Sequence, residues 1–491
     1  MQSVDHIIVI GSGVGGMTAA VILSKLGYRV TVVEKNKFPG GLMRSYVRRG
    51  IECEVGVHYV GAMDSGQPLR QIFALLGISW RMQFLRMGDE GIVDKYILPE
   101  MIFDFPPGVD LFEENLHRAF PEENRQIAAI VAVIRGAIER LSRMSMLFEE
   151  KAEFNLSIEL QSIETYFNKL GCSKELRRIL SVPLAWLGVG PEECPLYLWS
   201  SSISSYLMSS WRPARGGTYL ADTFANRLHE LGGELICNDE VLKIIVRDHV
   251  VHGVVLKSGE ELVSSMVIAA IHPKLMLKLL PDDSYKPSFK SRILSLQETP
   301  GIFATHVAVP EDKVPYRSYN TFVLNDVHAL HGGVTFFNMN KSSKPGWNII
   351  SILEESPYEK WRRWENTPRD HRTDDYKEAK DREANILFDK ASKVFGCMPG
   401  AYIVDSFTPL SFLDWMGSPE GGAYGVCRSV SQKFKTAAMH RTPIAGLHLV
   451  GQSVFAPGIL GTALGTLRVL APIIGYDVLH QEFIDSGVEG I

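Results

Sequence analysis

The chain has few cysteines for its length, and their spacing matches neither a metal site nor a disulfide framework. Its 491 residues include six cysteines, with no CxxC pair among them. We therefore expect ordinary thiols in a reducing compartment and no bound structural metal. The six positions are Cys53, Cys172, Cys194, Cys237, Cys397 and Cys427.

The sequence also lacks a surplus of charge of either sign. Lys and Arg total 51 against 56 Asp and Glu, so the formal net charge is −5. This balance gives no general attraction for nucleic acid. Hydrophobic residues make up 45% of the chain, which is enough for a core and for an apolar tunnel besides. At this length we expect two interleaved domains.

Neither a signal peptide nor a transmembrane helix is expected. The first apolar strand starts within a few residues of Met1 and runs directly into a glycine turn. The longest apolar stretch, about 447–474, contains several glycines together with Pro457, Arg468 and Pro472. This pattern is typical of a turn and a buried helix. We expect a cytoplasmic protein, with peripheral contact to a membrane as an open alternative.

The N-terminal segment has the order of elements that a dinucleotide site requires. An apolar strand over 7–10 leads into a glycine turn and a helix, and a second apolar strand ends at Glu34. The glycines close the turn, let the backbone approach a pyrophosphate and let the helix pack on the sheet. Glu34 is predicted to accept hydrogen bonds from an adenosine ribose. The predicted contacts in this segment are Gly11, Gly13, Val14, Gly15, Gly16, Glu34 and Lys35.

Two further glycine segments favour FAD over a nicotinamide cofactor. Residues 37–41 end in paired glycines that would let the backbone pass close to a second stretch of the cofactor. Near the other end, a short strand enters a glycine turn and 457–463 opens a last helix. The N-terminus of that helix is placed to stabilise negative charge on a reduced flavin ring. The predicted contacts here are Gly40, Gly41, Gly451, Gln452, Ile459, Gly461 and Thr462.

At these residues the chain resembles the FAD-dependent carotenoid desaturases and, more closely, the retinol saturases. The resemblance covers the whole chain and includes the segments 213–219, 232–241 and 267–273. The saturase branch is indicated by 54–61 and by 451–455. Two positions depart from the family patterns: Leu42 stands where the desaturases usually have Arg, and Glu54 stands where the saturases tend to have Asp. The resemblance implies that Leu42, Ser45, His58 and Val241 also contact FAD.

The motifs and the resemblance together predict an α/β fold with a discontinuous domain organisation. A doubly wound, Rossmann-like FAD-binding domain of the GR2 or amine-oxidase-like type is expected, with a discontinuous α+β substrate domain. The first insertion has the composition of helices, and the second alternates like strands. The FAD-binding domain is assigned to 1–60, 213–290 and 430–491, and the substrate domain to 61–212 and 291–429.

Few residues are candidates for acid–base chemistry, because no nucleophile elbow, HExxH motif or paired-cysteine site is present. A flavin can carry the difficult step, so the protein must bind, orient and protonate. His58 and Tyr59 follow the second glycine motif and are the predicted acid–base residues, although His58 has a structural role as its alternative. Glu54 is predicted to order its own loop. Tyr424 either faces the pocket or packs in the core.

Several apolar and charged segments have two interpretations. The aliphatic run over 127–148, and the aromatic segments 182–188 and 197–211, fit buried core or the wall of an elongated lipid pocket. The charged stretch 359–393, which carries Trp361 and Trp364, fits a solvated face or an interfacial helix.

Three functions of different classes follow from these patterns. The first is a flavoenzyme that saturates or desaturates an apolar polyene or isoprenoid, with an electron donor or acceptor that the sequence does not identify. The second is an amine-oxidase-like flavoenzyme on a small polar substrate. The third is a non-enzymatic binder of prenylated proteins, like the GDP-dissociation inhibitors. The glycine motifs at both ends of the chain favour an enzyme over the binder.

Overall fold

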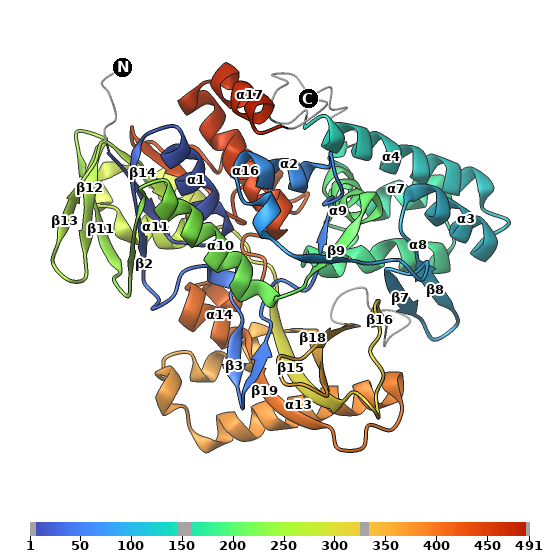
Figure 1. The fold of residues 1–491 in the computed structure, drawn as a ribbon. Helices are drawn as coiled ribbons and strands as arrows, with labels where there is room; N and C mark the ends of the chain where they lie inside the picture. Colours follow the sequence, from blue (N-terminus) through green and yellow to red (C-terminus); the bar gives the residue numbers. More distant parts are fainter. Residues whose placement is uncertain (1–5, 145–146, 148–158, 325–332, 488–491) are drawn as a thin grey trace.

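The computed structural model describes residues 6–144, 147, 159–324 and 333–487. One part of it is a five-stranded, fully parallel sheet whose strands come from three separate stretches of sequence (Figure 1). These strands are short runs of buried apolar residues because both faces of the sheet are covered. Ile7 and Val9 pack toward the helices, while Ile8 and Ile10 pack against the antiparallel strands of residues 241–256. In spatial order they are β10 (Glu234–Cys237), β2 (Arg29–Glu34), β1 (His6–Ile10), β14 (Met266–Ala269) and β20 (Leu447–Leu449).

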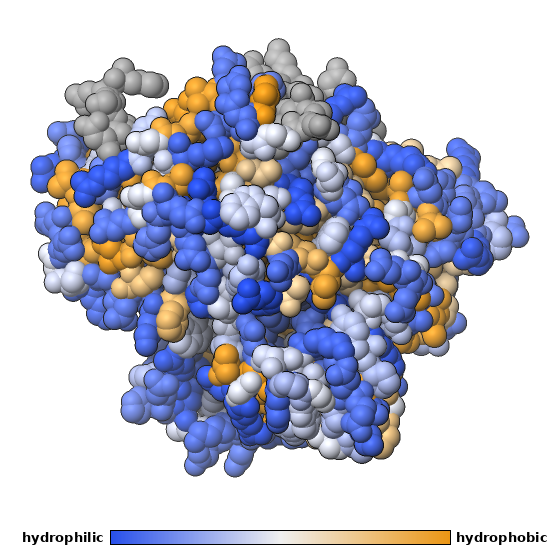
Figure 2. Space-filling model, in the orientation of Figure 1, coloured by the Kyte–Doolittle hydropathy of each residue, from blue (hydrophilic) through white to orange (hydrophobic). Residues whose placement is uncertain are grey.

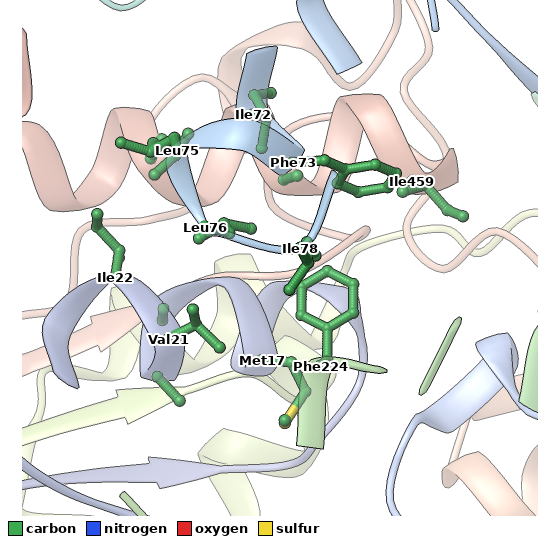
Figure 3. Packing of buried hydrophobic residues seen from close by; sticks show 14 of the residues in the cluster. Met17, Val21, Ile22, Ile72, Phe73, Leu75, Leu76, Ile78, Phe224 and Ile459 are labelled. Atoms are coloured by element: carbon green, nitrogen blue, oxygen red, sulfur yellow. The ribbon is translucent and has the colours of Figure 1, made fainter. Parts of the chain in front are cut away.

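Helices α1 (Val14–Lys25), α10 (Gly216–Glu230) and α16 (Gly458–Ile474) pack together beside this sheet. Met17, Val21 and Ile22 of α1 face the apolar side chains of α2 (Pro68–Leu75), and all of these are buried (Figure 3). Burial of such side chains contributes ~1.5–3 kcal/mol each, so this cluster holds α1 and the turn that precedes it in place. Two smaller antiparallel units lie outside the parallel sheet: β11 (Val241–Arg247), β12 (Val250–Leu256) and β13 (Glu261–Val263), and the hairpin of β3 (Tyr46–Arg48) and β4 (Ile51–Cys53).

The other large sheet has seven strands and belongs to the opposite part of the molecule (Figure 1). All its pairings are antiparallel except the one between β16 and β7. The long helix α13 (Asp374–Phe395) packs on this sheet. Its order is β19 (Tyr402–Phe407), β15 (Gly301–Pro310), β18 (Trp347–Ser356), β17 (Val334–Lys341), β16 (Asn320–Leu324), β7 (Asp94–Ile97) and β8 (Ile102–Phe105).

The first insertion is not purely helical, which corrects the sequence-based expectation. Its hairpin β7–β8 completes the seven-stranded sheet, because β7 pairs in parallel with β16 of the second insertion. Two short strands, β5 (Val60–Gly61) and β6 (Phe84–Arg86), pair with β9 (Ser210–Pro213). The other α-helices in the described part of this insertion are α3 (Val109–Ala119), α4 (Asn124–Ser142), α7 (Ile163–Leu170), α8 (Lys174–Ser181) and α9 (Leu196–Met208).

The apolar run over 127–148 forms mainly the buried side of α4, with Ile127, Ile130, Val131 and Ile134 at 2% exposure or less. Met146 and Phe148 of that run lie outside the described residues.

The tryptophans of the charged stretch face inward. Trp361 is fully buried and stacks on Phe303, with ring centroids 5.6 Å apart. Its indole N–H donates to Ser356 at 2.9 Å, and the indole of Trp364 donates to Asp375 at 3.1 Å. These contacts fasten the segment to the seven-stranded sheet, so the tryptophans do not lie at a lipid surface.

No helix in the described part of the chain combines the length and the apolarity needed to span a bilayer. The apolar stretch 447–474 folds instead as β20, a glycine turn and α16. On the face drawn in Figure 2, polar residues predominate and apolar ones form separate patches.

Candidate functional site

The glycine turn after β1 is closed tightly on one side and open on the other. A Cβ atom placed on Gly16 would lie 1.9 Å from the carbonyl oxygen of Gly11, and one on Gly15 would lie 2.9 Å from Cα of Gly451. Gly11 has φ +93°, which disfavours any side chain there. A Cβ atom on Gly13 would meet nothing within 4 Å. The open side therefore lies at the N-terminus of α1, where an anion is stabilised by free amide groups and the helix dipole.

Glu34 holds this turn in shape. Its Oε2 accepts hydrogen bonds from the amide (3.1 Å) and the hydroxyl (2.6 Å) of Ser12. Its Oε1 accepts two more from the amide (2.8 Å) and the side chain (2.9 Å) of Asn36. These four donors fill the roughly four acceptor positions of a carboxylate, so a ribose hydroxyl would have to exchange with one of them. The ribose contact of Glu34 stays a prediction.

The second glycine segment connects the turn to the interior of the molecule. The amide of Gly40 donates to the hydroxyl of Ser12 at 3.0 Å. A Cβ atom on Gly41 would lie 3.1 Å from Cα of Gly13, and one on Gly56 would lie 2.9 Å from the carbonyl oxygen of Leu42. Backbone thus runs in close contact from the turn through the second glycine pair to Gly56.

The other predicted cofactor residues lie on several elements around the glycine turn. Gly451 and Gln452 lie in the turn after β20, next to Gly15, and Ile459, Gly461 and Thr462 lie in the first turns of α16. Val241 begins β11, just after residues 238 and 239, whose amides donate to the carbonyls of Asn36 and Glu34. Lys35 follows the end of β2, and the hydroxyl of Ser45 bonds to Thr218 at 2.5 Å. The open Gly13, the tight glycine contacts and the α1 amides fit an extended dinucleotide.

A cavity of about 890 Å³ begins where this backbone path ends and opens to solvent at one part of its lining. It is lined by residues 56–61, by the segments 184–189 and 197–206, and by one face of α16. Most of the lining is aliphatic or aromatic, and the volume lies in the upper part of the range for small-molecule sites. The aromatic segments 182–188 and 197–211, for which the sequence allowed either a core or a pocket role, therefore contribute to both.

Five aromatic residues form a continuous wall of this cavity. The Tyr59 ring lies 4.6 Å from that of Tyr206, which lies 4.2 Å from Trp186, measured between centroids. Phe336 stacks with Tyr59 at 6.2 Å and contacts Phe322 at 4.8 Å. Flat rings at these separations suit a flat, conjugated ligand.

His58 lines the same cavity, but its ring nitrogens do not reach the surface of it. Both nitrogens are inaccessible and make no hydrogen bond of normal geometry with a described residue. Burial, reinforced by the positive charge of Arg212, lowers the pKa of His58 to about 4. The imidazole is therefore neutral at pH 7, and its role as an acid stays a prediction.

The Tyr59 hydroxyl points away from the cavity, into a buried polar network. It donates to Oδ2 of Asp94 at 3.0 Å, while the Asn320 amide donates to Oδ1 at 2.8 Å. Arg212 then donates to Asn320 at 2.9 Å. Burial raises the pKa of Asp94 to about 7, although these hydrogen bonds and the charge of Arg212 oppose the shift. A carboxyl group with this pKa is able to hold or release a proton near neutral pH.

Tyr206 is a site residue that motif analysis did not single out. Its hydroxyl is accessible to the cavity and has no hydrogen-bond partner among the described residues. Tyr424 also lines the cavity, and its hydroxyl donates to the Ala185 carbonyl at 2.9 Å. The only early signal for Tyr206 was its position within the aromatic segment 197–211.

Glu54 lies at the start of α10 and accepts a hydrogen bond from the Gly217 amide at 3.1 Å. Burial and the neighbouring charge of Glu52 raise its pKa to about 8. It does not line the cavity. Among the described residues no three His, Cys, Asp or Glu side chains gather as a metal-binding group.

Comparisons with known proteins agree with this geometry. Residues 9–76 match the model of the NAD(P)-binding Rossmann-like domain. An all-trans-retinol 13,14-reductase of Danio rerio is 24% identical over 97% of this chain and 86% of its own length. A 4,4'-diapophytoene desaturase of Methylomonas sp is 23% identical over 55% of this chain and 54% of its own length.

Among solved structures, an oxidoreductase from Methanosarcina mazei superposes with a TM-score of 0.67 at 14% identity, covering 95% of this chain and 99% of its own. Putrescine oxidase bound to putrescine gives a TM-score of 0.66 at 16% identity, with 96% and 99% covered. These two structural matches show the fold. The near full-length sequence similarity to the retinol reductase shows the evolutionary relationship. The chain is thus an oxidoreductase with a flavin-type dinucleotide site, and a relative of the retinol saturases and carotenoid desaturases.

Proposed function

We propose that the protein is an FAD-dependent oxidoreductase that adds hydrogen to a C=C bond of an apolar polyene or isoprenoid. The observation that carries the proposal is the deep, aromatic-walled cavity that begins beside the backbone path from the second glycine segment. The curated relatives named as retinol reductases and a carotenoid desaturase support the same substrate class. The desaturase sense is the reverse of the same exchange of hydrogen.

FAD is the dinucleotide that best suits the residues present. The turn at Gly13 would hold the pyrophosphate, Gly451 would contact the same region, and the first turn of α16 would approach the flavin ring. Bound FAD, when reduced, supplies a hydride equivalent to one carbon of the substrate double bond. The chain's own task is to orient that bond, exclude water and provide the proton.

We assign the proton to Tyr206 of the cavity wall. Tyr206 presents its hydroxyl to the cavity, and the Tyr59 ring lies against it with Asp94 behind. The negative charge of ionised Asp94 raises the pKa of Tyr206, so protonation of Asp94 makes the Tyr206 hydroxyl a better acid. Neutral His58, whose pKa is about 4, is a poor proton source at pH 7, and we assign it a role in shaping the cavity.

The decisive experiment is an anaerobic visible spectrum of the purified, chemically reduced protein before and after addition of a polyene. Return of the oxidised flavin bands, at a rate that depends on polyene concentration, is the expected result. Flavin that stays reduced with every polyene, while oxidised protein is bleached by a saturated isoprenoid, would reverse the direction. No change in either sense would refute the proposal.

The same purified protein also serves to test the other two functions. Rapid bleaching of oxidised flavin by a small amine under anaerobic conditions would support the amine-oxidase-like reaction. A colourless protein that cannot be reconstituted with FAD would support the prenyl-binding function. The polyene oxidoreductase predicts a yellow protein that amines leave unchanged.

A further inference from the structure

The part of the cavity near Arg468, in the C-terminal half of α16, contains a cluster of basic side chains. We define this basic cluster as Arg428, Lys433, His440, Arg441 and Arg468, all of which line the cavity. Arg428 is 8% exposed. It donates to the carbonyls of Thr436 (3.2 Å) and Ser453 (3.1 Å), and its buried Nε has no partner among the described residues. A buried guanidinium bonded only to neutral oxygens keeps its full positive charge uncompensated.

Other charges near this end reinforce the imbalance. The pKa of His440 is lowered first by burial and then by four basic residues, among them Arg428, Arg441 and Arg468. No described carboxylate forms an ion pair with Arg428, Lys433 or Arg441. Glu159, which also lines the cavity, pairs with Arg140 at 3.3 Å, and Glu193 accepts from the Ser431 amide at 3.0 Å.

The basic cluster is separate from the dinucleotide turn. Thr466 of α16 faces Gly15, whose Cβ position lies 3.2 Å from the Thr466 hydroxyl. Arg468 lies two residues further on, about 200° around a helix of ~3.6 residues per turn, and lines the cavity. A pyrophosphate in the turn would therefore lie on the opposite side of α16 from Arg468.

The cavity-lining face of α16 also gives the distance between the two ends of the cavity. Gly458, Gly461, Leu464, Arg468 and Pro472 recur every three to four residues and all line the cavity, so the helix runs along it. Ten residues separate Gly458 from Arg468, a distance of about 15 Å at ~1.5 Å rise per residue. Apolar lining between the two ends suits a hydrocarbon chain, and the positive end suits an anion.

We infer that the substrate is an amphiphile whose apolar polyene or isoprenoid chain ends in an anionic head group, a carboxylate or a phosphate, held by the basic cluster. This inference rests on the proposed function, since it specifies the substrate of the same cavity. The head group binds through Lys433 and Arg441, with the buried positive charge of Arg428 close behind them. The bond that reacts lies about 15 Å further along the chain.

The test compares binding of three matched ligands to the oxidised holoenzyme: a polyene carboxylate, the corresponding alcohol, and a prenyl monophosphate. Quenching of intrinsic fluorescence measures the dissociation constant, so no turnover is needed. The wild-type protein is expected to bind a charged ligand at least about tenfold more tightly than the alcohol, equivalent to ~1.4 kcal/mol. Tight binding of the carboxylate or of the phosphate identifies the source of the anion, and higher salt weakens it.

The variants are Lys433→Gln and Arg441→Gln, singly and together, with Lys435→Gln as the matched control. Lys435 loses the same charge from the same segment, but it does not line the cavity, and its ammonium donates to the Ser295 carbonyl at 3.3 Å. The double variant is expected to lose about tenfold in affinity for the charged ligand and none for the alcohol. The control is expected to bind both as the wild type does.

Three results would overturn the inference. The first is equal affinity of the wild type for alcohol and anion, and the second is equal loss of both in the double variant. The third is loss of sedimentation with anionic vesicles in the double variant while binding of the soluble anion is unchanged, which would make the cluster a membrane contact. Failure of the proposed function is distinguishable, because charge-dependent binding would persist without any change in the flavin spectrum.

Discussion

Substituting Gly13 and Gly16 by alanine separates the folding of the glycine turn from its cofactor function. Gly13 has φ −65°, which alanine adopts, and its added Cβ meets nothing within 4 Å. Reduced freedom of the unfolded chain stabilises by about 0.4–1 kcal/mol, and the poorer helix cap costs a similar amount. The apoprotein of Gly13→Ala should therefore unfold within about 1 kcal/mol of the wild type. Its methyl group would nevertheless enter the open space that we assign to the pyrophosphate.

The expected loss of flavin affinity follows from that overlap. Forcing a methyl group into a close-packed contact costs about 1–3 kcal/mol, which is roughly 5- to 150-fold in the dissociation constant. Gly16→Ala should lose both properties, because its Cβ would lie 1.9 Å from the Gly11 carbonyl oxygen. Urea unfolding of the apoprotein and titration with FAD, followed by flavin fluorescence, measure the two effects. Wild-type affinity in Gly13→Ala, or its collapse as an apoprotein, would refute the reasoning.

Three further predictions concern buried groups. Glu54 has a folded pKa of about 8 against an ordinary value of 4.5, so the stability that its protonated form contributes below pH 4.5 is lost as the pH rises toward 8. Between pH 5 and pH 8, the unfolding free energy of the wild type should therefore fall relative to that of Glu54→Gln, by at most about 1.4 kcal/mol per pH unit. Urea unfolding measures both, and parallel pH profiles of the two proteins would contradict this. Because the pKa of Asp94 is about 7, the rate of polyene-dependent flavin reoxidation should fall above neutral pH. Asp94→Asn should make this rate independent of pH near neutrality, whereas Tyr206→Phe should lower the rate at every pH. Unchanged profiles in both variants would exclude these groups from the proton path. Trp361→Ala should cost ~3–5 kcal/mol of unfolding free energy, because its ring is fully buried. Ligand affinity, measured at a temperature where the variant is folded, should stay intact because Trp361 does not line the cavity. A change of less than about 1 kcal/mol would show that the segment is loosely held.

The site contains both the residues that motifs predicted and residues that they missed. Gly11, Gly13 and Gly16 were predictable because a strand, a turn and a helix in sequence order fix their own local geometry. The contact between Gly15 and Gly451 joins residues far apart in the chain, and only a known family pattern suggested that both serve one cofactor. Tyr206 carried no signal beyond its apolar neighbours.

The amino-acid sequence by itself determined the Rossmann-like start, the flavin-type site and the family relationship, since these depend on glycines and apolar runs over short distances. Tertiary structure decided what depends on distant segments meeting. It paired β7 with β16 across the two insertions, turned Trp361 and the Tyr59 hydroxyl inward, and brought Arg428 and Arg441 alongside α16. Contacts between such distant segments depend on burial of apolar side chains and on strand pairing over the whole chain, so no local pattern of residues encodes them.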